Sequence, residues 1–181
     1  MKLIINSYLR QMKTILSALL LISFNLYAQD RLPVNKLIER NFELAAAQYK
    51  LLEKNTPDTL MPRFFDPATN KNGTSDTKWW CSGFFPGSLL YIYEQTKDTT
   101  IKRIAEKRLA ILEKEKYYTG NHDLGFMIYC SFGNAYRLFG KPEYKEAVMT
   151  AAASLATRYR PDILSIQSWN GGGRLHCPVI I

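Results

Sequence analysis

The chain has 181 residues, of which 46% are apolar and 13% aromatic, and its formal net charge is +8. An aromatic content of this size excludes a disordered chain, and the length is sufficient for one domain with a sizeable core. Beyond the N-terminal segment the basic residues are scattered, with no basic run interleaved with aromatic residues. The charge pattern therefore does not favour nucleic-acid binding.

The N-terminal segment has the pattern of a secretory signal peptide. Basic residues at Lys2, Arg10 and Lys13 precede the apolar run 15–24, and Ala28 ends a small-residue cleavage site. We therefore expect residues 1–28 to be a signal peptide, cleaved after Ala28, and the protein to be periplasmic or secreted. The apolar run is about half as long as a bilayer-spanning helix, so no membrane association is expected after cleavage.

The cysteines and histidines indicate neither a disulfide framework nor a zinc site. Cys81, Cys130 and Cys177 are odd in number, far apart and without a C-x-x-C pair, and His122 and His176 form no H-E-x-x-H motif. We expect Cys81 and Cys130 to be free thiols. No metal and no cofactor are expected.

Apolar residues at helical spacing predict amphipathic helices that each keep one polar face. These lie at 34–53, 99–116 and 142–159. Two further segments, 88–93 and 122–139, are apolar on nearly every side, which is typical of helices that are buried all round. Gly120 and Asn121 mark the turn before the second of these.

The remaining segments read as loops. Four helix-breaking residues exclude both a helix and a central strand from 55–78, so that segment is predicted to be a long loop. They are Pro57, Pro62, Pro67 and Gly73. The stretch 162–177 is also predicted to be a loop, and Pro178 begins an apolar run typical of the first turn of another buried helix.

The helices thus alternate between amphipathic and fully apolar, as a double-layered ring of helix hairpins requires. A weak repeat supports this arrangement, because residues 93–112 match residues 136–155 at an offset of 43 along the helical stripes. Tetratricopeptide arrays repeat at about 34 residues, so longer hairpins are indicated. The predicted class is all-α, with no strand of five residues or more between Val34 and Arg160.

The adjacent pair His122 and Asp123 is the leading candidate for chemistry. A carboxylate at the start of a helix is favoured by the free N–H groups and the helix dipole, and the solvent-facing end of a buried helix leaves it accessible. Equally, Asp123 can be a simple N-terminal cap with His122 as its partner. Spacing alone does not separate the two interpretations.

Several unlike motifs occur in order along the chain. They are Trp80-x-Ser82-Gly83-Phe84-Phe85-Pro86-Gly87, His122-Asp123-Leu124-Gly125-Phe126-Met127, Ser131-x-Gly133-Asn134-Ala135-Tyr136-Arg137-Leu138, Ser168-Trp169 and Pro178-Val179-Ile180-Ile181. With them the sequence resembles glycoside hydrolase family 88, the unsaturated glucuronyl hydrolases, from about Val34 to its end. The resemblance implies an (α/α)6 barrel, of which residues 29–181 would be the N-terminal part, about the first half of a single catalytic domain.

The resemblance also implies an activity. Members of the family remove Δ4,5-unsaturated uronic acid from the non-reducing end of lyase-generated oligosaccharides by hydrating the vinyl ether. An aspartate that serves as acid and base would follow Ile181 directly, so the 181-residue chain is expected to be inactive alone. Asp123 matches the second aspartate, which holds the substrate and tunes the first.

The same resemblance suggests which residues bind the substrate. His122, Trp80 and Trp169 would contact the sugar, with the two indole rings as aromatic walls. Phe126 lies one turn from Asp123 and is expected to keep the pocket dry. Trp80, Trp169 and Phe126 can alternatively be packing residues.

Two other functions compete with this one. An unsaturated rhamnogalacturonyl hydrolase would use the same barrel on a different neighbouring sugar. A non-catalytic periplasmic helical-repeat protein that binds glycans would fit the missing acid and base. The preferred disaccharide, its sulfation and the oligomeric state are left open by the sequence.

Overall fold

The computed structural model describes residues 12–14 and 33–169, mostly as helix. Contacts divide the chain into two units, Met1–Ile38 and Glu39–Ile181. The first residues of the helix Val34–Lys54 belong to the first unit, and all later helices and strands belong to the second. The predicted signal peptide, apart from residues 12–14, and the helix expected from Pro178 lie outside the described residues. Within those that are described, no helix combines the length and apolar character needed to cross a bilayer.

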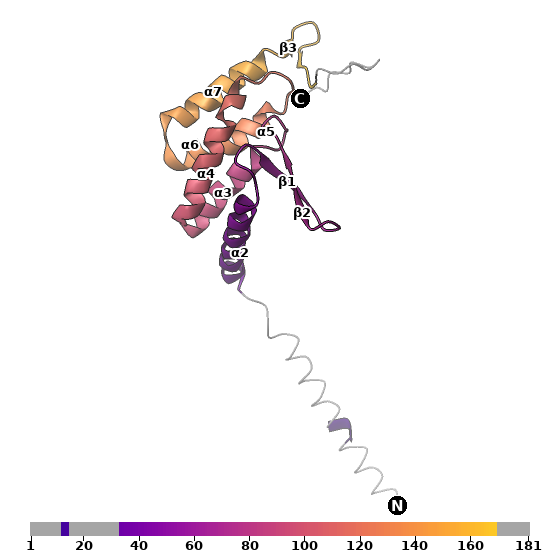
Figure 1. Cartoon of the computed structure of the whole chain (residues 1–181), viewed down its shortest axis with the longest axis vertical. Helices are drawn as coiled ribbons and strands as arrows, with labels where there is room; N and C mark the ends of the chain where they lie inside the picture. The colour runs from indigo at the N-terminus through magenta and orange to yellow at the C-terminus, as the bar shows by residue number, and fades with distance from the viewer. Residues whose placement is uncertain (1–11, 15–32, 170–181) are drawn as a thin grey trace, which may run out of the picture. The chain divides into compact units, whose positions relative to one another are not determined.

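The first helices follow the apolar periodicity of the sequence. They are α2 (Val34–Lys54), α3 (Phe84–Thr96) and α4 (Thr99–Leu112), followed by the short 3₁₀ helix η1 (Glu113–Tyr117). α3 and α4 form a hairpin in which Lys97 ends the first helix and Asp98 caps the second (Figure 1). The Asp98 carboxylate accepts hydrogen bonds from two backbone N–H groups of α4, which an N-cap residue is expected to do.

The segment predicted as one long helix after Gly120 has three parts. It is α5 (Leu124–Ile128), a π-helical turn η2 (Tyr129–Gly133) and α6 (Asn134–Phe139), and it is followed by α7 (Pro142–Ala156). A π turn leaves carbonyl groups without their usual helical partners. The Ser131 hydroxyl donates to the Met127 carbonyl at 2.6 Å, and the Asn134 amide donates to the Cys130 carbonyl at 2.9 Å.

Two glycines allow α3 to lie directly against this π turn. A Cβ at Gly83 would lie 2.0 Å from the Met127 carbonyl oxygen, and one at Gly87 would lie 2.4 Å from the Cys130 carbonyl oxygen. Any side chain at either position would therefore force the two backbones apart. The sequence motif around Gly83 and the sequence motif around Ser131 thus pack against each other where the two helices cross.

The weak repeat is present in the structure as two equivalent helix pairs. α4 begins at Thr99 and α7 at Pro142, which is the offset of 43 residues, and the preceding helices end at Thr96 and Phe139 with the same offset. The residues that end those helices, Lys97 and Gly140, both adopt the left-handed conformation, with φ of 57° and 65°. We call α3–α4 the first pair and α5–η2–α6 with α7 the second pair.

The segment predicted as a long loop contains a β-hairpin, so the prediction of no strand of five residues or more is wrong. β1 (Met61–Asp66) pairs antiparallel with β2 (Lys71–Ser75). Pro62 is tolerated because the sheet has only two strands and the register shifts beside this residue. Asp66 forms the turn by accepting hydrogen bonds from Ala68 and Thr69.

A smaller hairpin lies in the segment 159–166, where the sequence predicted the end of a helix and a loop. It pairs β3 (Tyr159–Arg160) with β4 (Ser165–Ile166). The helix before it ends at Ala156, three residues earlier than predicted, because the chain turns there toward the second strand. The structure remains mostly helical, but it is not wholly helical.

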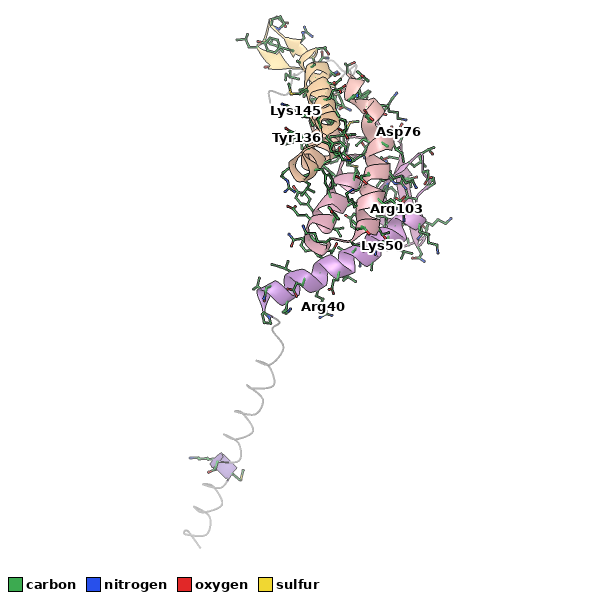
Figure 2. The ribbon with its side chains drawn as sticks, turned by 90° about the vertical axis from the view of Figure 1, so that its left-hand side faces the viewer. Arg40, Lys50, Asp76, Arg103, Tyr136 and Lys145 are labelled. Atoms are coloured by element: carbon green, nitrogen blue, oxygen red, sulfur yellow. The ribbon has the colours of Figure 1, made fainter. Side chains whose placement is uncertain are left out.

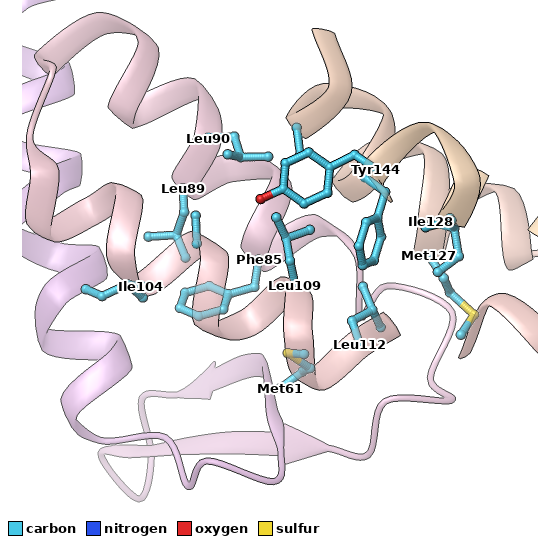
Figure 3. Close-up of a cluster of buried hydrophobic side chains, with 14 of the residues drawn as sticks. Met61, Phe85, Leu89, Leu90, Ile104, Leu109, Leu112, Met127, Ile128 and Tyr144 are labelled. Atoms are coloured by element: carbon cyan, nitrogen blue, oxygen red, sulfur yellow. The ribbon is translucent and has the colours of Figure 1, made fainter. Parts of the chain in front are cut away.

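The core lies between the first pair, the second pair and the β1–β2 hairpin. Met61 from β1, Phe85 and Leu89 from α3, and Leu109 and Leu112 from α4 are buried together (Figure 3). Met127, Ile128 and Tyr144 extend the same cluster into the second pair. This shared core fixes the N-terminal ends of α3 and α5, which carry the candidate site.

The two helices predicted to be buried all round are each exposed on one face, so that prediction is wrong. Tyr91 of α3 is 49% exposed, and Phe126, Tyr129 and Tyr136 of the second pair are 48%, 69% and 40% exposed. Within the described residues, neighbouring elements cover only the opposite face of each helix. Figure 2 shows the side chains on these helices, with Tyr136 labelled.

Candidate functional site

The sequence places Asp123 in the first turn of the helix predicted at 122–139, whereas in the structure Asp123 is the N-cap residue of α5, which begins at Leu124. The chain is turned into the helix by Asn121, whose side-chain oxygen accepts a hydrogen bond from the Asp123 N–H at 2.9 Å. The Asp123 carbonyl accepts the first helical bond from Met127. Its side chain is only 14% exposed, and it makes no capping hydrogen bond to α5. The simple-cap interpretation is therefore wrong for the side chain, and the carboxylate is left for another partner.

His122 connects this carboxylate to the end of the described chain. Its Nδ1 lies 3.2 Å from the Ser168 carbonyl oxygen, and its Nε2 lies 3.5 Å from Asp123 Oδ1. A carbonyl oxygen and a carboxylate oxygen can both only accept, so each contact requires an N–H group on the ring nitrogen that faces it. The imidazole ring thus lies between two acceptors, the Ser168 carbonyl and the Asp123 carboxylate. Because 3.5 Å exceeds the length of a normal hydrogen bond, Asp123 Oδ1 is positioned beside the ring and not locked to it.

Trp169 is brought to the same place by backbone pairing. Asn121 and Trp169 form an antiparallel β-bridge, and the His122 N–H donates to the Ser168 carbonyl at 2.8 Å. The indole ring meets the imidazole ring edge-on, with centroids 5.0 Å apart, and remains 57% exposed. His122, Asp123 and Trp169 therefore form one cluster, which we call the His–Asp cluster.

Trp80 lies in a second cluster, with Phe84 and Phe126. Trp80 is edge-on to Phe84 at 5.7 Å and to Phe126 at 6.2 Å, and the two phenyl rings lie 6.1 Å apart. All three side chains are exposed, by 42%, 38% and 48% respectively. Phe126 is therefore not a residue buried in the core. We call these three rings the aromatic cluster.

The two clusters are joined by α5, because Phe126 follows Asp123 by three residues, or almost one helical turn. Trp80 makes its ring contacts with Phe84 and Phe126, and Trp169 makes its ring contact with His122, so each indole belongs to its own cluster. Phe84 is a member that sequence reasoning missed. It stands in the Trp80 motif, four residues after Trp80, and that position was the available signal.

A groove of about 320 Å³ lies beside the aromatic cluster, between α2, α3 and the β1–β2 hairpin. Phe84 belongs to its lining, together with Tyr49, Phe64 and Phe65. Neither His122 nor Asp123 lines it, so it is a neighbour of the candidate site.

The cysteines in the described part of the chain are free, as predicted. Cys81 and Cys130 are both unpaired and partly buried, and burial raises the pKa of each thiol. At neutral pH both are therefore thiols, which are poor nucleophiles compared with thiolates. Across residues 12–14 and 33–169, no cluster of three or more histidine, cysteine and carboxylate side chains is arranged to hold a metal ion.

Comparison with known proteins gives consistent matches to one kind of enzyme. No family model matches the chain. An unsaturated glucuronyl hydrolase of Formosa agariphila is 39% identical over 95 residues, covering 52% of this chain and 24% of the relative. An unsaturated chondroitin disaccharide hydrolase of Streptococcus pneumoniae is 34% identical over 122 residues, covering 65% of this chain and 31% of the relative.

Solved structures agree with these matches. The crystal structure of an unsaturated glucuronyl hydrolase specific for heparin matches with a TM-score of 0.71 and 31% identity, over 77% of this chain and 37% of that one. A variant of the Streptococcus agalactiae enzyme, solved in complex with dGlcA-GalNAc6S, matches with a TM-score of 0.62 and 27% identity, over 73% of this chain and 35% of that one. The chain thus spans between about a quarter and two fifths of the length of these relatives.

By its fold and by these matches, the described chain is part of an α/α barrel that is homologous to hydrolases. More narrowly, the chain is a homologue of the unsaturated glucuronyl hydrolases of glycoside hydrolase family 88 and corresponds to their N-terminal part.

Proposed function

We propose that this chain supplies the N-terminal part of the active site of an unsaturated glucuronyl hydrolase. The reaction would remove a Δ4,5-unsaturated uronic acid from the non-reducing end of an oligosaccharide produced by a polysaccharide lyase. The observation that carries the proposal is the position of Asp123. Its side chain is 14% exposed, touches His122 and lies one turn from an exposed aromatic cluster.

The chemistry assigns a separate task to each group. A carboxylic acid protonates C4 of the unsaturated ring, water adds at C5, and the hemiketal that results opens and releases the neighbouring sugar. Asp123 would hold the substrate and raise the pKa of the proton donor by charge repulsion, because two carboxylates in one dry pocket do not ionise equally. His122 would keep the Asp123 carboxylate in place from the side of Ser168.

The aromatic rings would bind the sugar itself. Trp80 and Trp169 are both exposed, and an indole ring can stack on the apolar face of a pyranose. Phe126 and Phe84 support Trp80 edge-on and would fix its angle. Because Trp80 and Trp169 belong to different clusters, they would contact different parts of the oligosaccharide.

We further propose that the 181-residue chain alone does not turn over substrate. By the family resemblance, the aspartate that donates the proton follows Ile181. General acid–base catalysis contributes about 10²- to 10⁴-fold to a rate, so its loss leaves a chain that can bind and cannot react efficiently.

The test compares the 181-residue chain with a protein continued past Ile181 through a whole barrel. Disappearance of the ultraviolet absorbance of the C4=C5 bond reports the reaction on unsaturated glucuronyl disaccharides. We expect turnover by the continued protein and none by the shorter chain. Turnover by the shorter chain would contradict the assignment of the proton donor. Binding without turnover by both would favour a glycan-binding protein, and turnover of unsaturated rhamnogalacturonyl substrates alone would favour that hydrolase.

Export is proposed on the sequence pattern alone. Mass spectrometry of the mature protein from a bacterial host should find an N-terminus at Gln29, one residue after the predicted cleavage site. A protein that retains residues 1–28 and stays in the cytoplasm would contradict this proposal.

A further inference from the structure

Arg158 is a buried arginine that the proposed chemistry does not use. It follows α7 by two residues and is only 6% exposed. Burial lowers its pKa, yet arginine remains charged at neutral pH. A buried charge destabilises a protein unless its hydrogen-bonding groups have partners. The contacts of the Arg158 guanidinium therefore determine how well the fold tolerates this buried side chain.

Two backbone carbonyls accept hydrogen bonds from the Arg158 guanidinium. Nε donates to the Gln167 carbonyl at 2.7 Å, and Nη1 donates to the Thr119 carbonyl. The Gln167 N–H returns a hydrogen bond to the Arg158 carbonyl at 3.0 Å. One side chain thereby binds two chain segments that are far apart in sequence.

These two segments carry the His–Asp cluster. Thr119 precedes His122 and Asp123, and Gln167 precedes Trp169. The bridge between Asn121 and Trp169 and the bond from the His122 N–H to Ser168 lie only a few residues beyond the guanidinium. Arg158 therefore stands at the start of the pairing that sets Trp169 against His122.

The first helix pair contains an equivalent contact. Glu115 precedes Arg158 by 43 residues, the offset of the two pairs, and it is 3% exposed. Its carboxylate accepts a hydrogen bond from the Thr77 hydroxyl at 2.5 Å, and Thr77 lies three residues before Trp80. We call α4 and α7 the outer helices of the two pairs, and α3 and α5–η2–α6 the inner helices. In each pair a buried charged residue after the outer helix thus binds the segment that leads into the inner helix.

We propose that Arg158 is a positioning residue for the candidate site. Its guanidinium joins segments 119–123 and 167–169 and so fixes Trp169 and His122 beside Asp123. The structural part of this proposal stands on the contacts above, and its kinetic part rests on the proposed function.

Arginine suits this position because its planar fork can donate to two carbonyls at once. A lysine keeps the positive charge but has a single nitrogen, which cannot reproduce the fork. Arg158→Lys therefore removes the paired hydrogen bonds that link segments 119–123 and 167–169, and it leaves the charge at this position unchanged. Arg158→Met removes both the paired hydrogen bonds and the charge.

The structural part is tested by hydrogen exchange on the 181-residue chain, read by NMR or fragmentation mass spectrometry. A lost hydrogen bond from a charged donor predicts that the His122 amide exchanges about 10- to 100-fold faster in Arg158→Lys. Amides of Leu109 and Leu112 in the core of α4 should keep their protection. Arg160→Lys is the matched control, because Arg160 is exposed and pairs locally with Asp162.

The outcomes distinguish a local effect on the contacts of His122 from a general loss of stability. Faster exchange at His122 with unchanged α4 supports the proposal. Unchanged exchange at His122 in Arg158→Lys overturns it, and so does a uniform acceleration that includes α4. If Arg158→Met fails to fold, Arg158→Lys alone decides.

The kinetic part uses the protein continued through a whole barrel. Arg158→Lys should raise KM for an unsaturated disaccharide by about tenfold, because Trp169 is no longer held in place to stack on the sugar, and Arg160→Lys should not. Equal KM and kcat in a folded Arg158→Lys protein would overturn the positioning role. If no variant and no parent turns over substrate, the proposed function has failed, while the exchange result still stands.

Discussion

The first and second helix pairs share a plan and differ where the candidate site begins. Their outer helices α4 and α7 start 43 residues apart, and the inner helices before them end with the same left-handed turn. The inner helix of the first pair is a regular α-helix of 13 residues. Its counterpart contains a π turn and is preceded by His122 and Asp123.

The π turn distinguishes the second pair, which begins beside the His–Asp cluster, from the first pair. The π turn displaces carbonyls that Ser131 and Asn134 then bind, and it lets α3 approach through Gly83 and Gly87. π turns are frequent at functional sites. Here the π turn follows the short helix α5, and Asp123 stands at the start of that helix.

The largest expected effect comes from a residue that only the first pair has. Arg108 in α4 is fully buried and donates to Glu53 at 2.6 Å and to the Leu60 carbonyl at 2.7 Å, whereas the equivalent residue in α7 is Ala151. Arg108→Met leaves the Glu53 carboxylate without this partner and should lower the free energy of unfolding by about 3 kcal/mol or more. Urea denaturation followed by circular dichroism measures the change.

The control for that variant lies on the same helix. Arg103 is exposed on α4 and is labelled in Figure 2, and Arg103→Met should change the free energy of unfolding by no more than about 0.5 kcal/mol. If both variants unfold at the same urea concentration, the hydrogen bonds of Arg108 to Glu53 and Leu60 do not stabilise the first pair.

The crossing between the two pairs gives the next effect. Gly83→Ala places a Cβ against the Met127 backbone and should lower the free energy of unfolding by about 1–3 kcal/mol. Gly125→Ala, where no atom lies within 4 Å of the added Cβ, should raise it by about 0.5–1 kcal/mol. Equal stability of the two variants in urea would show that the helices do not meet as described.

The caps of the outer helices differ as well. Asp98 caps α4, whereas Lys141 at the same position before α7 makes no side-chain capping bond. Asp98→Ala should cost about 1 kcal/mol at neutral pH. The Lys50 hydrogen bond, together with the bonds from backbone N–H groups, lowers the pKa of Asp98 in the folded protein.

A lowered folded-state pKa fixes the sign of the pH dependence. The stabilisation by Asp98 is complete above its unfolded pKa of about 3.9 and is lost as the pH falls through the lower folded value. The stability difference between wild type and Asp98→Ala should therefore shrink in acid. Thermal unfolding at several pH values measures it, and a difference that grows in acid would contradict the assigned contacts.

The smallest effect concerns the residue that ends each inner helix. Lys97 has a φ of 57°, whereas the equivalent Gly140 has one of 65° and no Cβ to strain. Lys97→Gly should stabilise the protein by about 0.5–1 kcal/mol, and Gly140→Ala should destabilise it by a similar amount. Thermal unfolding of both variants checks the pair, and two shifts of the same sign would be inconsistent with a shared left-handed turn.

The sequence predicted those features that depend on local patterns. The apolar stripes of α2, α4 and α7 were found from their helical spacing, and the repeat was found from residues on those stripes. The His122–Asp123 pair was recognised as the leading candidate because a carboxylate beside a glycine turn stands at the start of an apolar helix. These signals need no knowledge of distant contacts.

Other features depend on contacts that the sequence does not display. The β1–β2 hairpin was missed because Pro62 argues against a strand, although Asp66 and Asn70 form a recognisable turn. Glu115 binds Thr77 across 38 residues and Arg158 binds Thr119 across 39 residues, so no local pattern marks these contacts. Their common offset of 43 was the one available signal, and it becomes visible only after the helix pairs are aligned.

The central claim is that the start of the second pair forms part of the active site, and Asp123→Asn tests it most directly. In the protein continued through a whole barrel, this change keeps the shape of the side chain and removes its charge. The rate of loss of the C4=C5 absorbance should fall at least about 100-fold, while the circular dichroism spectrum and the melting temperature stay close to wild type. Wild-type turnover by Asp123→Asn would contradict the account.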